Sequence, residues 1–492
     1  MRSGREDPAR PEAPEAAAEA SLDPEAGASL PSTALAAGVA PARAPSSAAH
    51  DSFAEIWNLS WPVMLSQGLL NVVGLVDIAM VGRLGAENVA AVGYATQFFQ
   101  LSQAVLFAVG FACVALMANA IGAGRPERAR RALAAALIVS CGSAVVLTSL
   151  MLSLADPLLR LLGAAPTVVP RAIPYLQLVV GSSLLLSVSM TFEFGLRADR
   201  NARTPMLIAG IVTLVKLVLN GLLIFGAAGF PRLELVGAGL ATLVSQGVGL
   251  ALFLAVVVRS PRDSPLGVRA RDFRAALPLI PEVARIAAPS VGERLSNNLA
   301  LLAYFRVLSG YGSIAIAAYT VGIRLLAFTW IPGVGFGTAA STLVGQALGA
   351  RDPAAAARAG WRSSYLSLAV AVALGGTCLL MPEALARLFT DDETLVQALV
   401  PFLLCLALTQ PSLQGQFALG GAHRGAGDTW TPFVATSVGN WALRVPVAFL
   451  LALVLEAPVV WIWALIFADH TLRAVWLAGS FRSGRWRKGL AG

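Results

Sequence analysis

The sequence predicts an all-α protein of twelve transmembrane helices, arranged as two parallel six-helix repeats around a central cavity. Three observations support this fold class. The 492 residues are 57% hydrophobic and 13% charged, with a mean hydropathy of +0.71, whereas a soluble protein carries about 25% charged residues. The apolar residues form blocks of roughly 20, the length that a helix needs to cross a bilayer. The chain also repeats itself at a fixed offset of 227 residues.

Twelve apolar blocks predict the twelve helices in chain order. The blocks begin near Ile56, Val89, Ala132, Pro174, Thr204, Val236, Val283, Ile314, Ala357, Thr394, Thr431 and Pro458. Their length favours helices over the short alternating strands of a transmembrane barrel. We therefore expect each block to cross the membrane once.

The repeat relates loops as well as helices, and it needs no gap. Residues that match at this offset are Pro62 and Pro289, Gly85 and Gly312, Ala91 and Ala318, Gly122 and Gly349, and Arg197 and Arg424. Because each half holds an even number of spans, both halves start on the same side of the membrane. Many secondary transporters consist of two such repeats, with the substrate path between them. The repeat therefore predicts transport across a membrane.

Composition divides the chain into five predicted parts. They are a disordered cytoplasmic tail (1–52), a first six-helix lobe (53–259), a cytoplasmic linker (260–281), a second six-helix lobe (282–481) and a basic cytoplasmic tail (482–492). The first tail is rich in Ala, Pro, Glu and Ser and has no apolar run of signal-peptide length.

Arginines in every second loop predict the orientation. They include Arg125, Arg200, Arg262, Arg351 and Arg485, and the intervening loops are nearly neutral or acidic. We expect a multi-pass protein of the cell inner membrane. By the positive-inside rule, both of its termini face the cytoplasm. The net charge of +8 thus belongs to membrane-flanking loops, so no nucleic-acid partner is expected.

The energy source is inferred by exclusion. A phosphate-binding P-loop requires Gly-x4-Gly-Lys-Ser/Thr, and the two lysines, Lys216 and Lys488, lie in no such motif. We therefore expect a monomer that is driven by an ion gradient, without an ATPase subunit, and whose partners are a small-molecule substrate and the lipid bilayer.

Enzymatic chemistry has little support in the sequence. The four cysteines form no Cys-x-x-Cys pair and the three histidines are widely separated, whereas a lipid-modifying enzyme should show clustered His or Asp ligands for a metal. We expect no catalytic residue, metal or cofactor.

Motifs at several helix ends resemble those of the multidrug and toxic compound extrusion (MATE) family. They are Gly74-Leu75-Val76-Asp77 leading into Val81-Gly82-Arg83-Leu84-Gly85, Val344 to Ala350, and Arg424 to Pro432. The likeness extends from about residue 55 to 481. It implies two six-helix lobes and an outward-pumping antiporter for amphipathic, often cationic, organic compounds.

Asp77, in the outer half of the first predicted span, is the strongest site candidate. A carboxylate within a membrane is costly and marks an ion or proton pathway by default, although it also has a structural interpretation as a hydrogen-bond partner. The family resemblance implies a role for an acid at this position in proton coupling.

Lys216 and Asn220 lie one turn apart in the fifth predicted span. Relatives commonly have Asn in place of Lys216 and often an acid in place of Asn220, so this chain departs at both positions. We expect Asp77 to face Lys216, with proton arrival breaking the pair. A static ion pair that only neutralises two charges is the alternative.

Glu293, Asn297 and Gln67 are candidates for the substrate cavity or a polar site in the second lobe. Hydrogen bonding between helices is the alternative role. Some members of the family carry acids at the places of Asn297 and Leu413, and their absence here argues against sodium coupling. We expect export of amphipathic, cationic compounds in exchange for protons, by alternating access of the two lobes. The alternatives are a sodium-coupled drug antiporter and a flippase for lipid-linked sugars, which should have more cationic residues in its cavity.

Overall fold

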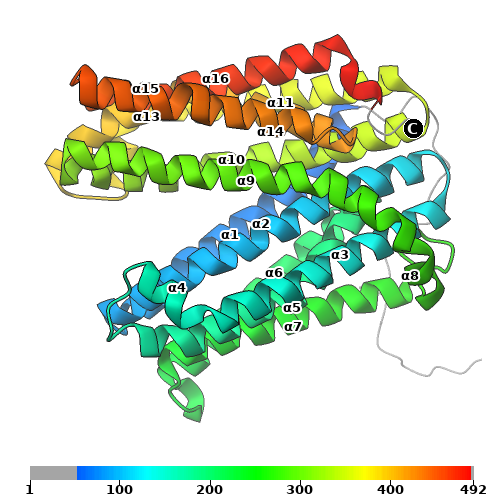
Figure 1. Cartoon of the computed structure of the whole chain (residues 1–492), viewed down its shortest axis with the longest axis horizontal. Coiled ribbons are helices and arrows are strands. Elements are labelled where there is room, and N and C mark those ends of the chain that lie inside the picture. Colours follow the sequence, from blue (N-terminus) through cyan, green and yellow to red (C-terminus); the bar gives the residue numbers. More distant parts are fainter. Residues whose placement is uncertain (1–51, 489–492) are drawn as a thin grey trace, which may run out of the picture. The chain divides into compact units, whose positions relative to one another are not determined.

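The computed structural model describes residues 52–488 (Figure 1). Ser52 caps the first helix by accepting a hydrogen bond from the backbone N–H of Ala54 at 3.3 Å. The rest of the predicted tail at 1–52, and residues 489–492 of the predicted C-terminal tail, lie outside the described residues.

The first lobe consists of seven helices, of which six are long enough to cross a membrane. They are α1 (Phe53–Gly82), α2 (Ala86–Gly122), α3 (Pro126–Ser153), the short α4 (Ala155–Leu161), α5 (Val169–Ala198), α6 (Arg203–Phe225) and α7 (Glu234–Arg259). Helix α2 packs against α3 and α5, while α7 packs against α5 and α6. The short helix α8 (Ala270–Ala276) follows in the connection to the second lobe.

The second lobe repeats this order. It contains α9 (Ile280–Leu308), α10 (Ser313–Gly349), α11 (Pro353–Leu380), the short α12 (Pro382–Arg387), α13 (Glu393–Gly425), an interrupted helix, and α16 (Val459–Ser483). The interrupted helix runs from α14 (Trp430–Val438) through the π-helical segment η4 (Gly439–Arg444) and α15 (Val445–Phe449) to η5 (Leu450–Val454). Helix α13 packs against α10, α11 and α16.

Eleven segments among residues 52–488 are long and apolar enough to cross a membrane. The one remaining long helix within residues 52–488 is α9, the seventh span in chain order. Its 29 residues carry two charged residues near the middle, Glu293 and Arg294. The predicted fold class of twelve helices in two six-helix repeats is therefore confirmed.

The long helices end in matched caps at the end of the bundle that bears the arginine-rich loops. Gly124 after α2 and Arg351 after α10 have positive φ values of 67° and 60°, and Arg200 and Gly427 form the second such pair. Each pair is separated by 227 residues. A left-handed residue after a helix lets the next N–H groups satisfy the last free carbonyls, so the repeat preserves the cap even where Arg replaces Gly.

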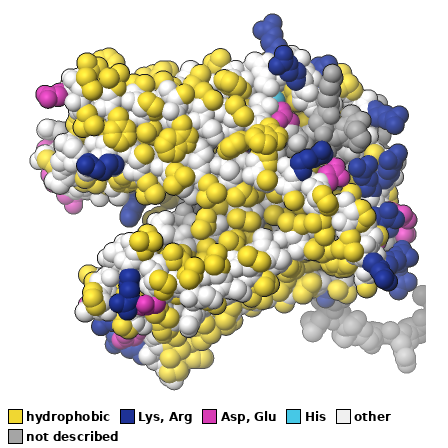
Figure 2. All heavy atoms as spheres, in the orientation of Figure 1, with side chains coloured by type: hydrophobic (Ala, Val, Ile, Leu, Met, Phe, Trp, Pro, Cys, Tyr) yellow, Lys and Arg dark blue, Asp and Glu magenta, His cyan; other side chains and the backbone are white. Residues whose placement is uncertain are grey.

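The two lobes meet at this arginine-rich end. Helix α10 packs against α1 and α2 of the first lobe, and α9 packs against α2. Figure 2 shows that the halves diverge away from this end and leave a cleft that opens at the left of the view. The cleft therefore lies between the two repeats, where the sequence predicts the substrate path.

Candidate functional site

In the first lobe, Asp77, Lys216 and Asn220 form one polar cluster. The Lys216 ammonium is ion-paired with the Asp77 carboxylate, and the Asn220 amide donates to Asp77 Oδ1 at 2.5 Å. Helix α1 supplies Asp77, and α6 supplies the other two residues. Successive turns of α6 place Lys216 and Asn220 on one face, so a single carboxylate contacts both.

This cluster is only partly enclosed. The Asp77 and Lys216 side chains are 23% and 19% exposed, while Asn220 is fully buried. The cluster therefore holds the Asp77 carboxylate in contact with a base and an amide, and neither charged side chain is sealed inside the lobe.

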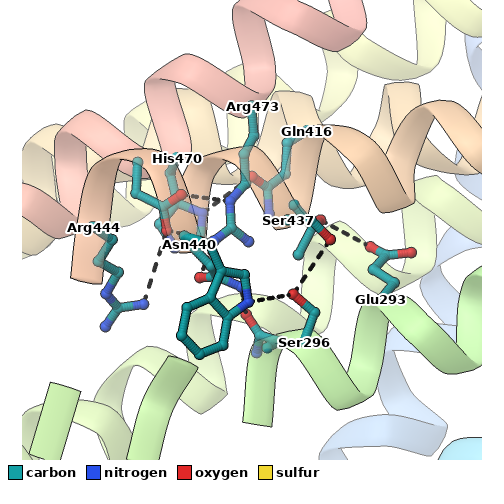
Figure 3. Close-up of polar contacts among 12 residues, drawn as sticks. Glu293, Ser296, Gln416, Ser437, Asn440, Arg444, His470 and Arg473 are labelled. Atoms are coloured by element: carbon teal, nitrogen blue, oxygen red, sulfur yellow. Dashed lines mark hydrogen bonds and ion pairs between the residues drawn. The ribbon is translucent and has the colours of Figure 1, made fainter. Parts of the chain in front are cut away.

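In the second lobe, Glu293 of α9 lies in a polar contact between helices. Arg424 Nη2 of α13 donates to both carboxylate oxygens, at 2.9 and 2.8 Å, and Thr436 Oγ1 of α14 donates to Glu293 at 3.2 Å. One turn further along α9, Ser296 accepts hydrogen bonds from Ser437 and from the Trp441 indole (Figure 3).

A second group of charges lies deeper in this lobe, around Asp469 of α16. Arg473 binds Asp469 through two nitrogens, at 2.6 and 2.5 Å, and also donates to Asn440 Oδ1 at 2.6 Å. Asn440 in turn donates to Asn297 Oδ1 at 3.4 Å. Arg444 approaches the same carboxylate at 3.9 Å, so one carboxylate is shared by two guanidinium groups (Figure 3).

The π-helical segment η4 positions two members of this group. Asn440 of η4 contacts Arg473 of α16 and Asn297 of α9. The Arg444 guanidinium lies 4.3 Å from the centre of the Tyr304 ring of α9 and donates to the Tyr319 hydroxyl of α10 at 3.2 Å. A Cβ on Gly439 would overlap the Asp469 carboxylate. π-Helical turns are rare and concentrate at functional sites.

The two lobes differ at this level of the membrane. At the offset of 227 residues, Tyr304 occupies the place of Asp77. The first lobe thus has a neutral acid–lysine pair where the second lobe has a tyrosine covered by an arginine.

The structure brings together most of the residues that the sequence singled out. Asp77, Lys216 and Asn220 form one cluster. In the second lobe, Glu293 contacts α13 and α14, while Asn297 contacts η4. Gln67 lies in α1 of the first lobe, where its carbonyl accepts from Asn71 at 2.9 Å. Within residues 52–488, no hydrogen bond connects the Gln67 side chain to Glu293 or Asn297.

Asp469, Arg473 and Asn440 were not predicted as site residues. The available signal was the spacing of Asp469 and Arg473, which are four residues apart in an apolar span and so lie on one face of a helix. The partners of Arg444 come from three other helices, and no local pattern indicates them. Among the described residues, no group of three His, Cys, Asp or Glu side chains lies close enough to hold a metal ion.

Two six-helix repeats of membrane-length helices, with ionisable clusters among them, are typical of a multi-pass membrane transporter. The MatE family model matches residues 62–222 and 289–450, one segment in each lobe. The chain therefore belongs to the MATE family, the family that its helix-end motifs resemble.

Relatives and solved structures match across both lobes. A Thermotoga maritima protein named "Probable multidrug resistance protein NorM" is 28% identical over 445 residues, which cover 88% of this chain and 93% of its own length. A Bradyrhizobium diazoefficiens protein of the same name is 32% identical over 429 residues, or 84% and 89% of the two chains. A solved structure described as the outward-facing conformation of a multidrug resistance MATE family transporter of the MOP superfamily aligns with a TM-score of 0.81 at 23% identity, covering 88% of this chain and 97% of that chain. The last match supports the fold.

Proposed function

We propose that the chain exports amphipathic small organic compounds across the cell inner membrane in exchange for protons. The cluster of Asp77, Lys216 and Asn220 carries this proposal, because it places a partly exposed carboxylate, paired with a lysine, among the membrane-length helices of the first lobe. No nucleotide site or cofactor takes part in this scheme, and the proton gradient supplies the energy. The transporter acts as a monomer and needs no ATPase subunit.

Protonation of Asp77 removes the partner of Lys216. An unpaired ammonium within the membrane is costly, so the lysine must lose its proton, reach water or find another acceptor as α1 moves. Helix α1 also contacts the second lobe, since Gly335 of α10 approaches Ser60 and Met64. A shift of α1 at Asp77 therefore changes the contact between the lobes.

The arginine-rich loops orient this cycle. With those loops and both termini in the cytoplasm, the closed end of the structure faces inwards and the cleft of Figure 2 opens outwards. Proton entry from outside then accompanies release of the exported compound.

Transport into everted membrane vesicles tests the proposal. Two xanthene dyes, fluorescein and rhodamine 6G, are offered as substrates under an imposed proton gradient or an imposed sodium gradient. The wild-type chain should accumulate at least one dye under the proton gradient. Asp77→Asn should reduce that accumulation at least about tenfold, because the amide cannot carry a proton, a change worth roughly 1.4 kcal/mol or more.

Asp156→Asn is the matched control. Asp156 is 46% exposed and pairs with Arg160 in α4, outside the long spans, so this variant should transport as the wild type does. Equal membrane levels of all three proteins must be shown. Undiminished proton-driven transport in Asp77→Asn, or transport driven by sodium alone, would refute proton coupling through Asp77.

Two alternatives remain distinct outcomes of this test. Sodium-driven transport would identify a sodium-coupled antiporter, and gradient-independent movement of a lipid-linked sugar would identify a flippase. The family resemblance predicts cationic substrates, whereas the arginines of the second lobe favour the opposite charge.

A further inference from the structure

The face of α10 that closes the arginine-rich end continues outwards along the cleft. Gly335 on this face contacts Ser60 and Met64 of α1. Residues 7 and 11 positions earlier lie on the same face of a helix, and these are Phe328 and Arg324. Both are exposed, so the face that meets α1 at one end lines the open cleft further out.

Arg294 of α9 also faces the opposite lobe. Its guanidinium carbon lies 4.9 Å from the centre of the Phe107 ring on α2, and its side chain is exposed. Helix α2 belongs to the first lobe, so Arg294 lies where the two lobes approach each other. Within residues 52–488, no carboxylate oxygen lies within 4.0 Å of the guanidinium of Arg294 or Arg324.

On the opposite side, the faces of α1 and α2 that meet the second lobe are uncharged. On α1, the face of Met64 continues outwards through Asn71, Leu75 and Ile78, at spacings of 7, 11 and 14 residues. On α2, the face of Phe107 continues through Gln103, Gln100 and Thr96. These side chains are amides, a hydroxyl and alkyl groups, so the first lobe offers neutral contacts.

The ion pairs inside the two lobes show which charged side chains are already paired. In the first lobe, Asp77 pairs with Lys216 and Glu193 with Arg197. In the second lobe, Arg424 pairs with Glu293 of α9 and Arg473 pairs with Asp469 of α16.

Other arginines of the second-lobe helices, among them Arg294, Arg324 and Arg444, have no carboxylate to themselves within the part of the chain that the structure describes. Uncompensated charge within a membrane is costly and indicates a functional site. An anionic ligand would compensate it.

We propose that the cleft binds an amphipathic organic anion, with Arg294 and Arg324 recognising its acidic group and the neutral wall of α1 and α2 contacting its apolar body. The guanidinium group suits this task, since its planar fork matches the oxygens of a carboxylate or phosphate. Phe107 and Phe328 beside the two arginines supply aromatic surface. This substrate class rests on the proposed export function and replaces the cationic expectation.

Equilibrium binding to the purified full-length chain in detergent tests the charge preference without any gradient. Fluorescein and rhodamine 6G share a xanthene ring system but carry opposite charges at neutral pH, and fluorescence polarisation reports their binding, with empty micelles as the blank. Fluorescein should bind at least about tenfold more tightly, and added salt should weaken it by screening. Tighter binding of rhodamine 6G, or binding of neither dye, overturns the proposal.

Single variants locate the site. Arg294→Gln and Arg324→Gln should each weaken fluorescein binding about tenfold, the loss expected for one charge-assisted hydrogen bond. Arg306→Gln removes the same charge from another face of α9 and should leave binding unchanged. An equal loss in Arg306→Gln, or no loss in both test variants, contradicts the assignment. The wild-type dye comparison stands even if a variant fails to fold.

Competition separates two sources of the anion. Displacement of fluorescein by 2-naphthoate indicates a soluble organic acid, and displacement by short-chain phosphatidylglycerol indicates a lipid phosphate. Displacement by neither overturns the anion site. Intact dye binding with no proton-driven transport would refute the proposed function while leaving this inference in place.

Discussion

At the residue scale, Asp428 shows how a charged side chain stabilises a helix junction outside the membrane spans. It lies between α13 and α14, where His423 Nδ1 is 3.0 Å from its carboxylate and Thr431 donates through its backbone N–H at 3.0 Å and its hydroxyl at 2.6 Å. Burial alone raises the pKa of Asp428, but the hydrogen bonds from His423 and Thr431 outweigh it and hold the pKa below the ordinary 3.8.

This lowered pKa predicts a pH-dependent contribution to stability. A carboxyl group whose pKa is lower in the folded state stabilises the fold above its unfolded pKa, and the contribution is lost as pH falls through the folded pKa. Asp428→Asn should therefore lower the free energy of unfolding by about 1 kcal/mol at pH 7, with the difference shrinking as pH falls below about 3.8. Thermal unfolding in detergent at pH 7 and pH 3 measures both values. A difference that is equal at the two pH values would contradict this account.

Single residues were predictable where their type is rare in its context. Asp77 and Lys216 stand out because charges in apolar spans are costly, and their cluster follows from one long-range contact between α1 and α6. Arg444 was equally visible, but its partners Tyr304, Tyr319 and Asp469 come from three helices. Sequence spacing predicts which residues share a face of one helix. It does not predict how three neighbouring helices are oriented towards that face.

At the element scale, α10 and α13 pack closely through small residues. A Cβ on Gly421 would overlap the carbonyl of Gly337, and a Cβ on Gly425 would overlap the carbonyl of Ser341. On each helix the two small residues are four positions apart, so they lie on the same face of that helix. Close approach of backbones through small residues is a main source of helix association in membranes.

Alanine at Gly421 should disrupt this packing. The new methyl group must push the helices apart, and overpacking of this kind costs about 1–3 kcal/mol. Gly415 lies on the same helix, and no neighbouring atom lies within 4 Å of the place that a methyl group would take there, so Gly415→Ala should leave stability unchanged or raise it. The midpoint of thermal unfolding in detergent compares the two variants. Equal midpoints would show that the contact contributes nothing.

The elements themselves were the most predictable level of the structure. Apolar length and the repeat predicted all twelve spans, and the arginine-containing caps follow from the same repeat. The interruption of the eleventh span by η4 was not predicted, because residues Gly439–Arg444 read locally as ordinary helix. The irregular turn arises from tertiary contacts of Asn440 and Arg444, which a local pattern does not contain.

At the scale of the whole transporter, the lobes close on each other through a contact that obeys the repeat. A Cβ on Gly122 of α2 would overlap the carbonyl of Gln346, and a Cβ on Gly349 of α10 would overlap the carbonyl of Asn119. Both glycines and both partners are related by 227 residues. Each of these glycines therefore lets one lobe approach the other, and glycine occupies the same place in both halves of the repeat.

Hydrogen bonds from α10 to the end of α5 add to this closure. Thr342 donates to the Arg197 carbonyl at 3.1 Å, and Gln346 donates to the Ala198 carbonyl at 2.7 Å. Gln346 also accepts from the Arg200 guanidinium at 2.6 Å. These bonds must break when the arginine-rich end opens, so they favour the state in which the cleft opens at the other end.

Alanine at Gly122 or Gly349 should move the equilibrium towards opening of the arginine-rich end. Relief of the overlap requires separation of the lobes, and a penalty of about 1–3 kcal/mol changes the ratio of the two states by about 5- to 150-fold. Spin labels at Glu127 and Ala354, which are exposed and related by the repeat, report this separation on a background in which the four native cysteines are replaced. The distance distribution should shift to longer values in both variants. Gly142→Ala, where no atom lies within 4 Å, should match the parent protein, and the same shift there, or none in the two test variants, would show that the glycine crossing does not set the equilibrium between the two states.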